Sequence, residues 1–230
     1  MRFVPPEVNL AGAVLRLAFT AARRGNAPAV SSRMEKNRLE AFSDGVLAII
    51  ITIMVLELKV PHGYDFAALK PLLPIFLSYV LSFIYIGIYW NNHHHLLKAA
   101  RRVNGTIMWA NLHLLFWLSL FPFATGWMGE NHFTPLPSAV YGGVLLIAAI
   151  AYTFLQKCII AEDGSDSRLA QSIERDHKGK LSIMLYAVGV AASFYRGWLG
   201  QAIYTLVALM WFIPDRRIER VVAEEERGHR

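Results

Sequence analysis

A chain of 230 residues that is 55% hydrophobic and only 17% charged is too apolar for an ordinary water-soluble domain. Its formal net charge of +6 does not indicate a nucleic-acid partner, because a basic excess beside apolar segments sets membrane topology and attracts anionic lipid head groups. The composition therefore favours an all-α membrane protein whose surroundings are the lipid bilayer.

Residues 1–34 differ in composition from the rest of the chain. Residues 8–22 are moderately apolar, but they include Arg16 and are too short to span a bilayer. We expect this leader to be disordered or associated with the membrane surface. An upstream extension ahead of a translation start at Met34 is the alternative.

Apolar windows of nearly bilayer length recur between residues 35 and 217. A hydrocarbon core of roughly 30 Å requires about 20 mostly apolar residues per helix, and four windows approach this length: 41–58, 72–90, 106–128 and 139–155. Residues 181–213 contain one charge, Arg196, beside Gly197, so they are expected to form two short spans or a re-entrant hairpin. The pattern predicts six transmembrane helices over 35–217, followed by a cytoplasmic tail at 218–230.

The distribution of basic residues predicts the orientation of these helices. If the amino terminus is cytoplasmic, all but Lys59, Lys70 and Arg196 of the 23 Lys and Arg residues fall on the cytoplasmic side. Cytoplasmic loops carry such a positive excess. Both termini are therefore predicted to be cytoplasmic, in a multi-pass protein of the cell (inner) membrane.

The first apolar window opens with polar residues that a lipid-facing helix would not need. Asp44 follows Ser43 near the cytoplasmic end, and an ionisable group at the bilayer centre costs at least about 2.5 kcal/mol. Either Asp44 is partly solvated and fixes the helix start together with Ser43, or it accepts hydrogen bonds from neighbouring helices. The candidate partners at a matching depth are Trp90, Asn91, Asn92, His93, His94 and His95 at the end of the second window, and Asn111 at the start of the third.

Residues 93–95 are three consecutive histidines, but their spacing argues against a metal site. Consecutive helical residues point about 100° apart, so the three rings cannot all bind one ion. The sequence also contains no H-E-x-x-H, C-x-x-C, G-x-S-x-G or glycine-rich phosphate loop. We therefore predict no metal site, no cofactor and no enzymatic activity.

One face of the first helix is predicted to be almost entirely aliphatic. At about 100° per residue, Gly45, Ile49, Thr52, Ile53 and Leu56 share this face. On a lone helix such a stripe packs against lipid or core. In a symmetric oligomer it would line the central axis as stacked hydrophobic rings. The composition of the stripe does not choose between these two arrangements.

The segment RLEAFSDGVLAIIITIMVL resembles the R-x-x-x-F-S-D signature that opens the first helix of the endolysosomal potassium channel called transmembrane protein 175 and its bacterial relatives. The motif positions here are Arg38, Phe42, Ser43 and Asp44. The Trp-then-His cluster that closes the second window and the segment NLHLLFWLSLFPFATG also resemble this family. The resemblance therefore covers most of residues 35–217.

The resemblance implies a homotetramer with the first helices around the axis and a channel domain over 35–217. It implies passive flux of monovalent cations, with K⁺ as the permeant ion and moderate potassium selectivity. Ile49 matches the constriction, Ile53 and Leu56 match further hydrophobic layers, and Thr52 matches a threonine linked to potassium preference. The motif residues match a structural network with the second and third helices that includes His93 or His94.

Two other classes of membrane protein remain open. A small secondary transporter would need binding groups at the bilayer midplane and usually broken helices or repeats. No repeat is evident, and Pro122 is the only obvious interruption well inside a span. A non-conducting membrane scaffold would require only packing.

Overall fold

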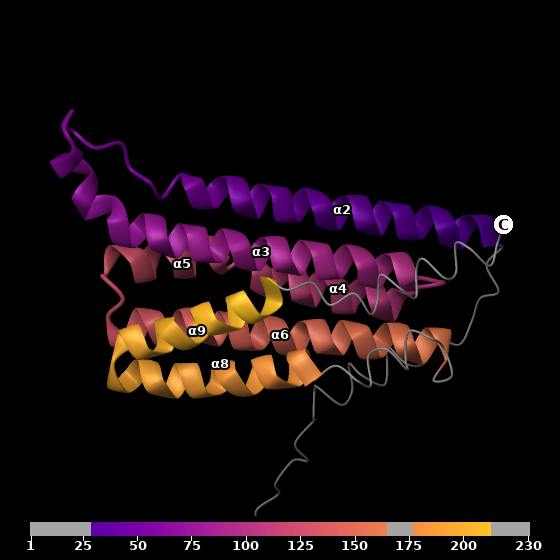
Figure 1. Ribbon diagram of the computed structural model, residues 1–230. Coiled ribbons are helices and arrows are strands. Elements are labelled where there is room, and N and C mark those ends of the chain that lie inside the picture. The colour runs from indigo at the N-terminus through magenta and orange to yellow at the C-terminus, as the bar shows by residue number, and fades with distance from the viewer. Residues whose placement is uncertain (1–28, 165–176, 213–230) are drawn as a thin grey trace, which may run out of the picture.

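The computed structural model describes residues 29–164 and 177–212, and the regular elements of these residues are all helices. Figure 1 shows the longer helices lying side by side along one axis. The elements are α2 (Ala29–Val55), the 3-10 helix η1 (Phe66–Leu72), α3 (Leu73–Ala99), α4 (Gly105–Leu118), α5 (Phe121–Glu130), α6 (Pro135–Asp163), α8 (His177–Tyr195) and α9 (Gly197–Phe212). The predicted tail at 218–230 and residues 1–28 of the predicted leader lie outside the described residues. Residues 29–34 of that leader form the first turns of α2.

Helix α2 lies at one edge of the bundle (Figure 1) and packs against α3, α4 and α5. The side chains that it buries recur every three or four residues: Leu39, Ser43, Leu47, Ile50 and Met54. This spacing places them on one face of an α-helix. The opposite face is exposed and is available to lipid or to another molecule.

Helices α4 and α5 together occupy the window that the sequence predicted to be one helix over 106–128. In the structure α4 ends at Leu118 and α5 begins at Phe121, and the two helices together form one segment, Gly105–Glu130, that is long and apolar enough to cross a membrane. Pro122 lies in the first turn of α5. It lacks a backbone N–H, and its ring clashes with the carbonyl four residues earlier, so the regular helical hydrogen bonding is interrupted there. The span is therefore a broken helix.

Helices α8 and α9 form a short hairpin against the half of α6 that begins at Pro135 (Figure 1). Arg196 is the single residue between the two helices, which is where the sequence predicted the turn. The helices approach closely because Gly200 faces the Gly189 carbonyl and the Ser193 side chain, and a Cβ at residue 200 would overlap both. Glycine is therefore needed at this crossing.

Three helical segments of the described chain are long and apolar enough to cross a membrane: Phe66–Ala99, Gly105–Glu130 and Pro135–Asp163. Helix α9 is apolar, but its 16 residues rise only about 24 Å. Helix α2 is long enough to cross a membrane, but it is less apolar than these segments because its last 18 residues include Arg38, Glu40 and Asp44. The chain is thus all-helical with several membrane-spanning segments, and a count of six spans remains a prediction.

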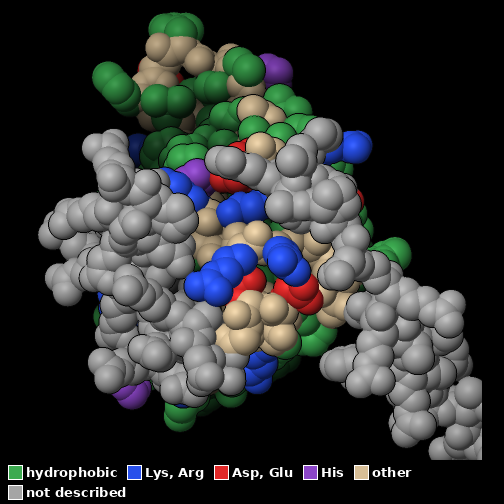
Figure 2. All heavy atoms as spheres, turned by 90° about the vertical axis from the view of Figure 1, so that its right-hand side faces the viewer, with side chains coloured by type: hydrophobic (Ala, Val, Ile, Leu, Met, Phe, Trp, Pro, Cys, Tyr) green, Lys and Arg blue, Asp and Glu red, His purple; other side chains and the backbone are tan. Residues whose placement is uncertain are grey.

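The bundle end at which α2 begins and α3 and α6 finish carries many charged side chains. Figure 2 shows Lys and Arg side chains there beside acidic ones. Lys36 Nζ donates to the Lys98 and Ala100 carbonyl oxygens at 2.9 and 2.8 Å, and the Asp163 carboxylate accepts from the Arg101 backbone N–H. These contacts tie α2 and α6 to the end of α3. The charge of this end agrees with a cytoplasmic location.

The opposite end carries an exposed ion pair between the loop after α2 and the end of α5. Lys59 Nζ lies 2.9 Å from Glu130 Oε1. The hydrogen bond and the negative charge of Glu130 raise the pKa of Lys59 above its ordinary value, so the amine stays protonated at neutral pH. Exposed pairs of this kind add little to stability.

Neighbouring glycines on α6 provide a matched test of the packing around Tyr204. Tyr204 is buried, and its phenol fills the space where a Cβ on Gly142 would lie, whereas a Cβ on Gly143 would meet nothing within 4 Å. We expect Gly142→Ala to lower the free energy of unfolding by about 2 kcal/mol through overpacking. Gly143→Ala should be neutral or slightly stabilising, because alanine favours the helix. Thermal unfolding in detergent measures both, and equal effects would contradict this packing.

Candidate functional site

Three of the four residues that the sequence placed on a possible pore axis lie on the exposed face of α2, and the fourth, Leu56, directly follows its last residue, Val55. Ile49, Ile53 and Leu56 are 58%, 44% and 74% exposed, and Thr52 is also exposed. By contrast, Leu47 and Ile50 on the bundle face are 1% and 3% exposed. The structure therefore separates two faces of one helix. The outer face is apolar and carries one hydroxyl.

The Thr52 hydroxyl is held in a defined orientation. Its Oγ1 lies 3.1 Å from the Ala48 carbonyl oxygen and 2.9 Å from the Ile49 carbonyl oxygen of the preceding turn. The proton is therefore directed at the helix backbone. A hydroxyl oxygen that donates in this way retains lone pairs, which on this face can approach a cation.

A buried chain of hydrogen bonds joins α2, α4 and α3 behind that face. Asn111 Nδ2 donates to Ser43 Oγ at 2.9 Å, and Ser43 Oγ donates to the Leu39 carbonyl at 2.8 Å. His93 Nε2 lies 2.6 Å from Asn111 Oδ1, and because that oxygen accepts, the imidazole donates. Ser43, His93 and Asn111 are each at most 1% exposed. His93 Nδ1 is buried without a hydrogen-bond partner among the described residues. In a low-dielectric interior, the bonds of this chain still favour one register of its helices.

The Asp44 carboxylate accepts a hydrogen bond from a different donor, on the more exposed side of the same turn. Trp90 Nε1 donates to Asp44 Oδ1 at 3.1 Å. His94 stacks on the Trp90 ring, and its Nδ1 lies 2.9 Å from Glu40 Oε1. His93 therefore bonds to the serine of the motif through Asn111, while His94 contacts Glu40, one helical turn before Asp44.

The other two motif residues do not join this network. Phe42 is 53% exposed, and Arg38 is exposed as well. At about 100° per residue both lie within roughly 20° of Ile49 on the wheel, so they continue the outer stripe towards the cytoplasmic end. The structure thus divides the R-x-x-x-F-S-D motif: Ser43 and Asp44 face the bundle, and Arg38 and Phe42 face outwards.

Two contacts of α2 were not predicted from the sequence. Lys36 binds the last carbonyls of α3, which has no short-range signal because the partners are backbone atoms 62 and 64 residues away. Glu40 lies on the same face as Asp44, four residues earlier. That i, i+4 spacing placed it within reach of the histidine cluster.

The side chains around α2 anchor this helix to the bundle and leave one face of it exposed. No group of three or more His, Cys, Asp or Glu side chains that could hold a metal ion occurs in residues 29–164 and 177–212. Most polar groups of the site donate to or accept from one another. Helix α2 therefore has one buried face, whose Ser43 joins the hydrogen bonds that fix it to the bundle, and one largely apolar face that is exposed.

Comparison with known proteins identifies what this arrangement resembles. Residues 38–122 match the family described as endosomal/lysosomal potassium channel TMEM175. A potassium channel of Chryseobacterium sp. (strain P1-3) is 58% identical over 191 residues, which cover 83% of this chain and 100% of that relative. A potassium channel of Chamaesiphon minutus is 32% identical over 190 residues, or 76% of this chain and 92% of the relative.

A solved structure extends the likeness to the fold. The crystal structure of a lysosomal potassium-selective channel TMEM175 homolog from Chamaesiphon minutus superposes with a TM-score of 0.69 at 30% sequence identity. The alignment covers 78% of this chain and 97% of that one. The proteins in these comparisons are ion channels, not enzymes, and use no cofactor.

Proposed function

The chain belongs to the TMEM175 potassium channel family, and on that premise we propose that it forms a potassium-permeable channel with α2 lining the pore. Four copies surround the axis, with K⁺ as the permeant ion and passive flux. The protein lies in the cell (inner) membrane with both termini cytoplasmic. This orientation is supported by the charged bundle end in Figure 2.

The observation that carries this proposal is the exposed stripe of Ile49, Thr52, Ile53 and Leu56. Lipid would accept the aliphatic side chains equally well, but polar contacts of Lys36, Ser43 and Asp44 also attach α2 to α3 and α4. A helix facing only lipid needs no such attachment. A helix that lines a shared axis must keep its rotation, because a shift by one residue turns its side chains by about 100°.

Conduction in this arrangement depends on hydrophobic rings. Four copies of Ile49 form the narrowest ring, and Ile53 and Leu56 form layers further out. Narrow apolar rings pass ions only when they hydrate or widen. The Thr52 oxygen lies between the levels of Ile49 and Ile53 and supplies a ligand where a cation loses water, so the selectivity for potassium should be moderate.

Flux distinguishes this proposal from a small secondary transporter or a non-conducting scaffold. Purified protein in liposomes should pass K⁺ down its gradient without a coupled substrate, above the rate of empty vesicles. A transporter would saturate and couple to a second solute, and a scaffold would pass no ion. Absence of flux from folded, oligomeric protein would contradict the channel proposal.

Cysteine cross-linking tests the placement of α2 independently of conduction. The chain has one cysteine, Cys158, so a Cys158→Ser background carries no native thiol. Ile49→Cys in this background should form disulfide-linked dimers on oxidation, because facing copies approach each other at the narrowest ring. Phe194→Cys on α8 is the control, since Phe194 is also exposed, at 62%. Equal cross-linking at both positions would argue against α2 at the axis.

Thr52→Val tests the role of the hydroxyl with almost no change of shape. The variant removes the oxygen on the stripe, so we expect the K⁺ to Na⁺ permeability ratio to fall by about two- to fivefold, or roughly 0.4 to 1 kcal/mol. Thr205→Val is the matched control, because Thr205 on α9 is exposed and its hydroxyl donates to the Gln201 carbonyl of the same helix. Reversal potentials in planar bilayers give the ratio, and an unchanged ratio in Thr52→Val would exclude this role.

A further inference from the structure

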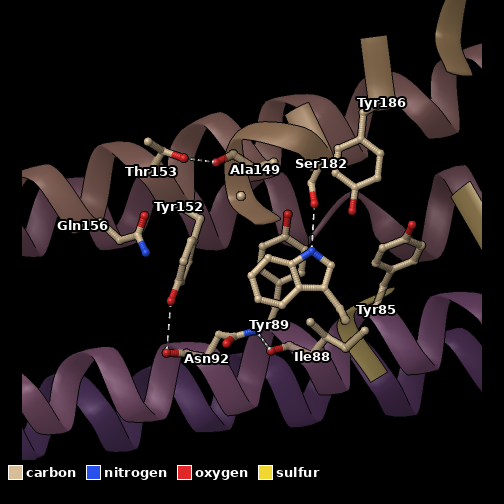
Figure 3. A pocket seen from close by; sticks show the side chains of 12 residues that line it. Tyr85, Ile88, Tyr89, Asn92, Ala149, Tyr152, Thr153, Gln156, Ser182 and Tyr186 are labelled. Atoms are coloured by element: carbon tan, nitrogen blue, oxygen red, sulfur yellow. Dashed lines mark hydrogen bonds between the residues drawn. The ribbon is translucent and has the colours of Figure 1, made fainter. Parts of the chain in front are cut away.

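A second site lies inside the bundle, away from α2. It is a partly enclosed cavity of about 50 Å³ between α3, α6, α8 and α9. Figure 3 shows that aromatic rings form much of its wall; they belong to Tyr85, Tyr89, Tyr152, Tyr186 and Trp211. The family's pore requires none of these side chains, so the cavity is a separate feature of the fold.

Most polar groups of the cavity wall are already paired within the protein. Asn92 Nδ2 donates to the Ile88 carbonyl, and Ser182 Oγ accepts from Trp211 Nε1 (Figure 3). Thr153 Oγ1 donates to the carbonyl of the preceding turn in the same way. Each of these groups therefore has at least one hydrogen-bond partner within the protein.

Gln156 differs from them. Its side chain is 4% exposed and points from α6 into the cavity (Figure 3), yet its amide makes no hydrogen bond to any described residue. The Tyr89 hydroxyl on the facing helix α3 also lacks a hydrogen bond within the described chain, although Tyr89 is only 8% exposed. An amide in apolar surroundings costs about 1 to 3 kcal/mol when it has no partner. The cavity therefore presents a donor, an acceptor and a hydroxyl to an occupant.

The charge of the wall restricts the occupant. The cavity is lined by no Asp, Glu, Lys or Arg among the described residues. Lys178 lies near its edge, where its ammonium is 5.9 Å from the Trp211 ring centroid. A second cation there would be repelled, and an anion would lack a charged partner inside the cavity. The side chains of the cavity wall therefore favour an uncharged occupant.

The size of the cavity sets the scale of that molecule. About 10 to 15 Å³ of such volume holds one water, so the cavity accommodates about four waters or a molecule of four or five non-hydrogen atoms. The tyrosine rings suit an aliphatic part, and the Gln156 amide suits a group that both donates and accepts.

We propose that this cavity binds a small uncharged amphiphile with one hydroxyl group, of the size of butanol. The hydroxyl bonds to the Gln156 amide and the Tyr89 hydroxyl, and the aliphatic part lies against the rings of Tyr152 and Tyr186. In the absence of such a molecule, water fills the same positions. This inference concerns binding and does not depend on whether the chain conducts ions.

Photolabelling tests the site. A diazirine analogue of butanol is irradiated with the full-length protein in liposomes, and mass spectrometry maps the labelled residues. We expect labels on Tyr89, Tyr152 or Tyr186, reduced severalfold by excess butanol. Gln156→Leu should lower this labelling about fivefold, because it removes the polar anchor at similar size. Gln201→Leu on α9, outside this cavity, should leave it unchanged.

Tyr89→Phe keeps the experiment decisive if Gln156→Leu does not fold. It removes one hydroxyl, keeps the ring, and should lower labelling about two- to threefold. Labels restricted to outward-facing side chains, insensitivity to butanol or equal labelling of wild type and the cavity variants would each overturn the proposal. In that case water alone occupies the cavity.

Discussion

Ile49→Asn is expected to raise potassium flux through reconstituted protein by about three- to tenfold and to bring the K⁺ to Na⁺ ratio closer to unity. The isoleucine side chain is 58% exposed on the stripe of α2, and four copies would form the narrowest apolar ring. An amide at this position binds water, so the ring stays hydrated and the barrier to ion passage falls. A tenfold change corresponds to about 1.4 kcal/mol.

Val55→Asn on the same helix is the matched control for Ile49→Asn. Val55 is 42% exposed, but it lies about 120° away from Ile49 on the helical wheel. The same new amide there should leave flux and selectivity near the wild-type values. Flux is read from a potassium-sensitive dye in liposomes, after equal protein content and oligomeric state are verified. A rise in both variants would indicate a general leak, and a rise in neither would exclude Ile49 as the constriction.

The register of α2 is the part of the site that the sequence predicts best. A helix turns by about 100° per residue whatever its surroundings, so the shared face of Ile49, Thr52, Ile53 and Leu56 follows from their spacing alone. Their exposure in the structure agrees with this face. Whether this face contacts lipid or three other copies of the chain depends on molecules outside the chain. The periodicity of α2 therefore does not predict which of the two it contacts.

The partners of the motif were predictable as a set but not one by one. Depth in the membrane brings Trp90 and the three histidines to the level of Asp44, and that much can be read from distances along the helices. The choice between His93 and His94 depends on the rotation of α3 against α4. Packing sets that rotation, because consecutive residues point about 100° apart. His93 turns into the bundle and is 1% exposed, whereas His94 remains half-buried beside Glu40.

The ends and breaks of the helices were predicted less well. Hydropathy continues through Pro122, so the window 106–128 was predicted as one span, and the structure divides this span into the two helices α4 and α5. Hydropathy measures the cost of transfer into lipid, whereas a helix ends where a backbone hydrogen bond is lost. For the same reason α3 and α6 extend past their apolar windows, to Ala99 and Asp163, into polar residues that remain helical.

Asn111→Leu is expected to destabilise the folded protein by about 2 kcal/mol. The amide accepts from His93 and donates to Ser43, and all three side chains are buried. Leucine leaves the His93 Nε2 proton without an acceptor, which costs about 1 to 3 kcal/mol, and also removes a bond to Ser43. For a chain of this length the midpoint of thermal unfolding should fall by about 4 to 8 °C. Scanning fluorimetry in detergent measures it.

Asn91→Leu is the matched control, because Asn91 on α3 is exposed and the same exchange there should change stability by less than about 0.5 kcal/mol.

A double variant distinguishes a broken hydrogen-bond chain from a simple packing defect. His93→Phe combined with Asn111→Leu removes the orphaned imidazole together with its partner, and replacing both members of a buried pair by apolar groups is much less costly than replacing one. The double variant should therefore recover at least half of the stability lost in Asn111→Leu. Additive losses from the two substitutions would mean that the side chains contribute independently. In that case the anchor of α2 would depend on the Asp44 contact with Trp90 and on the binding of Lys36 to the end of α3, and not on the chain through Ser43.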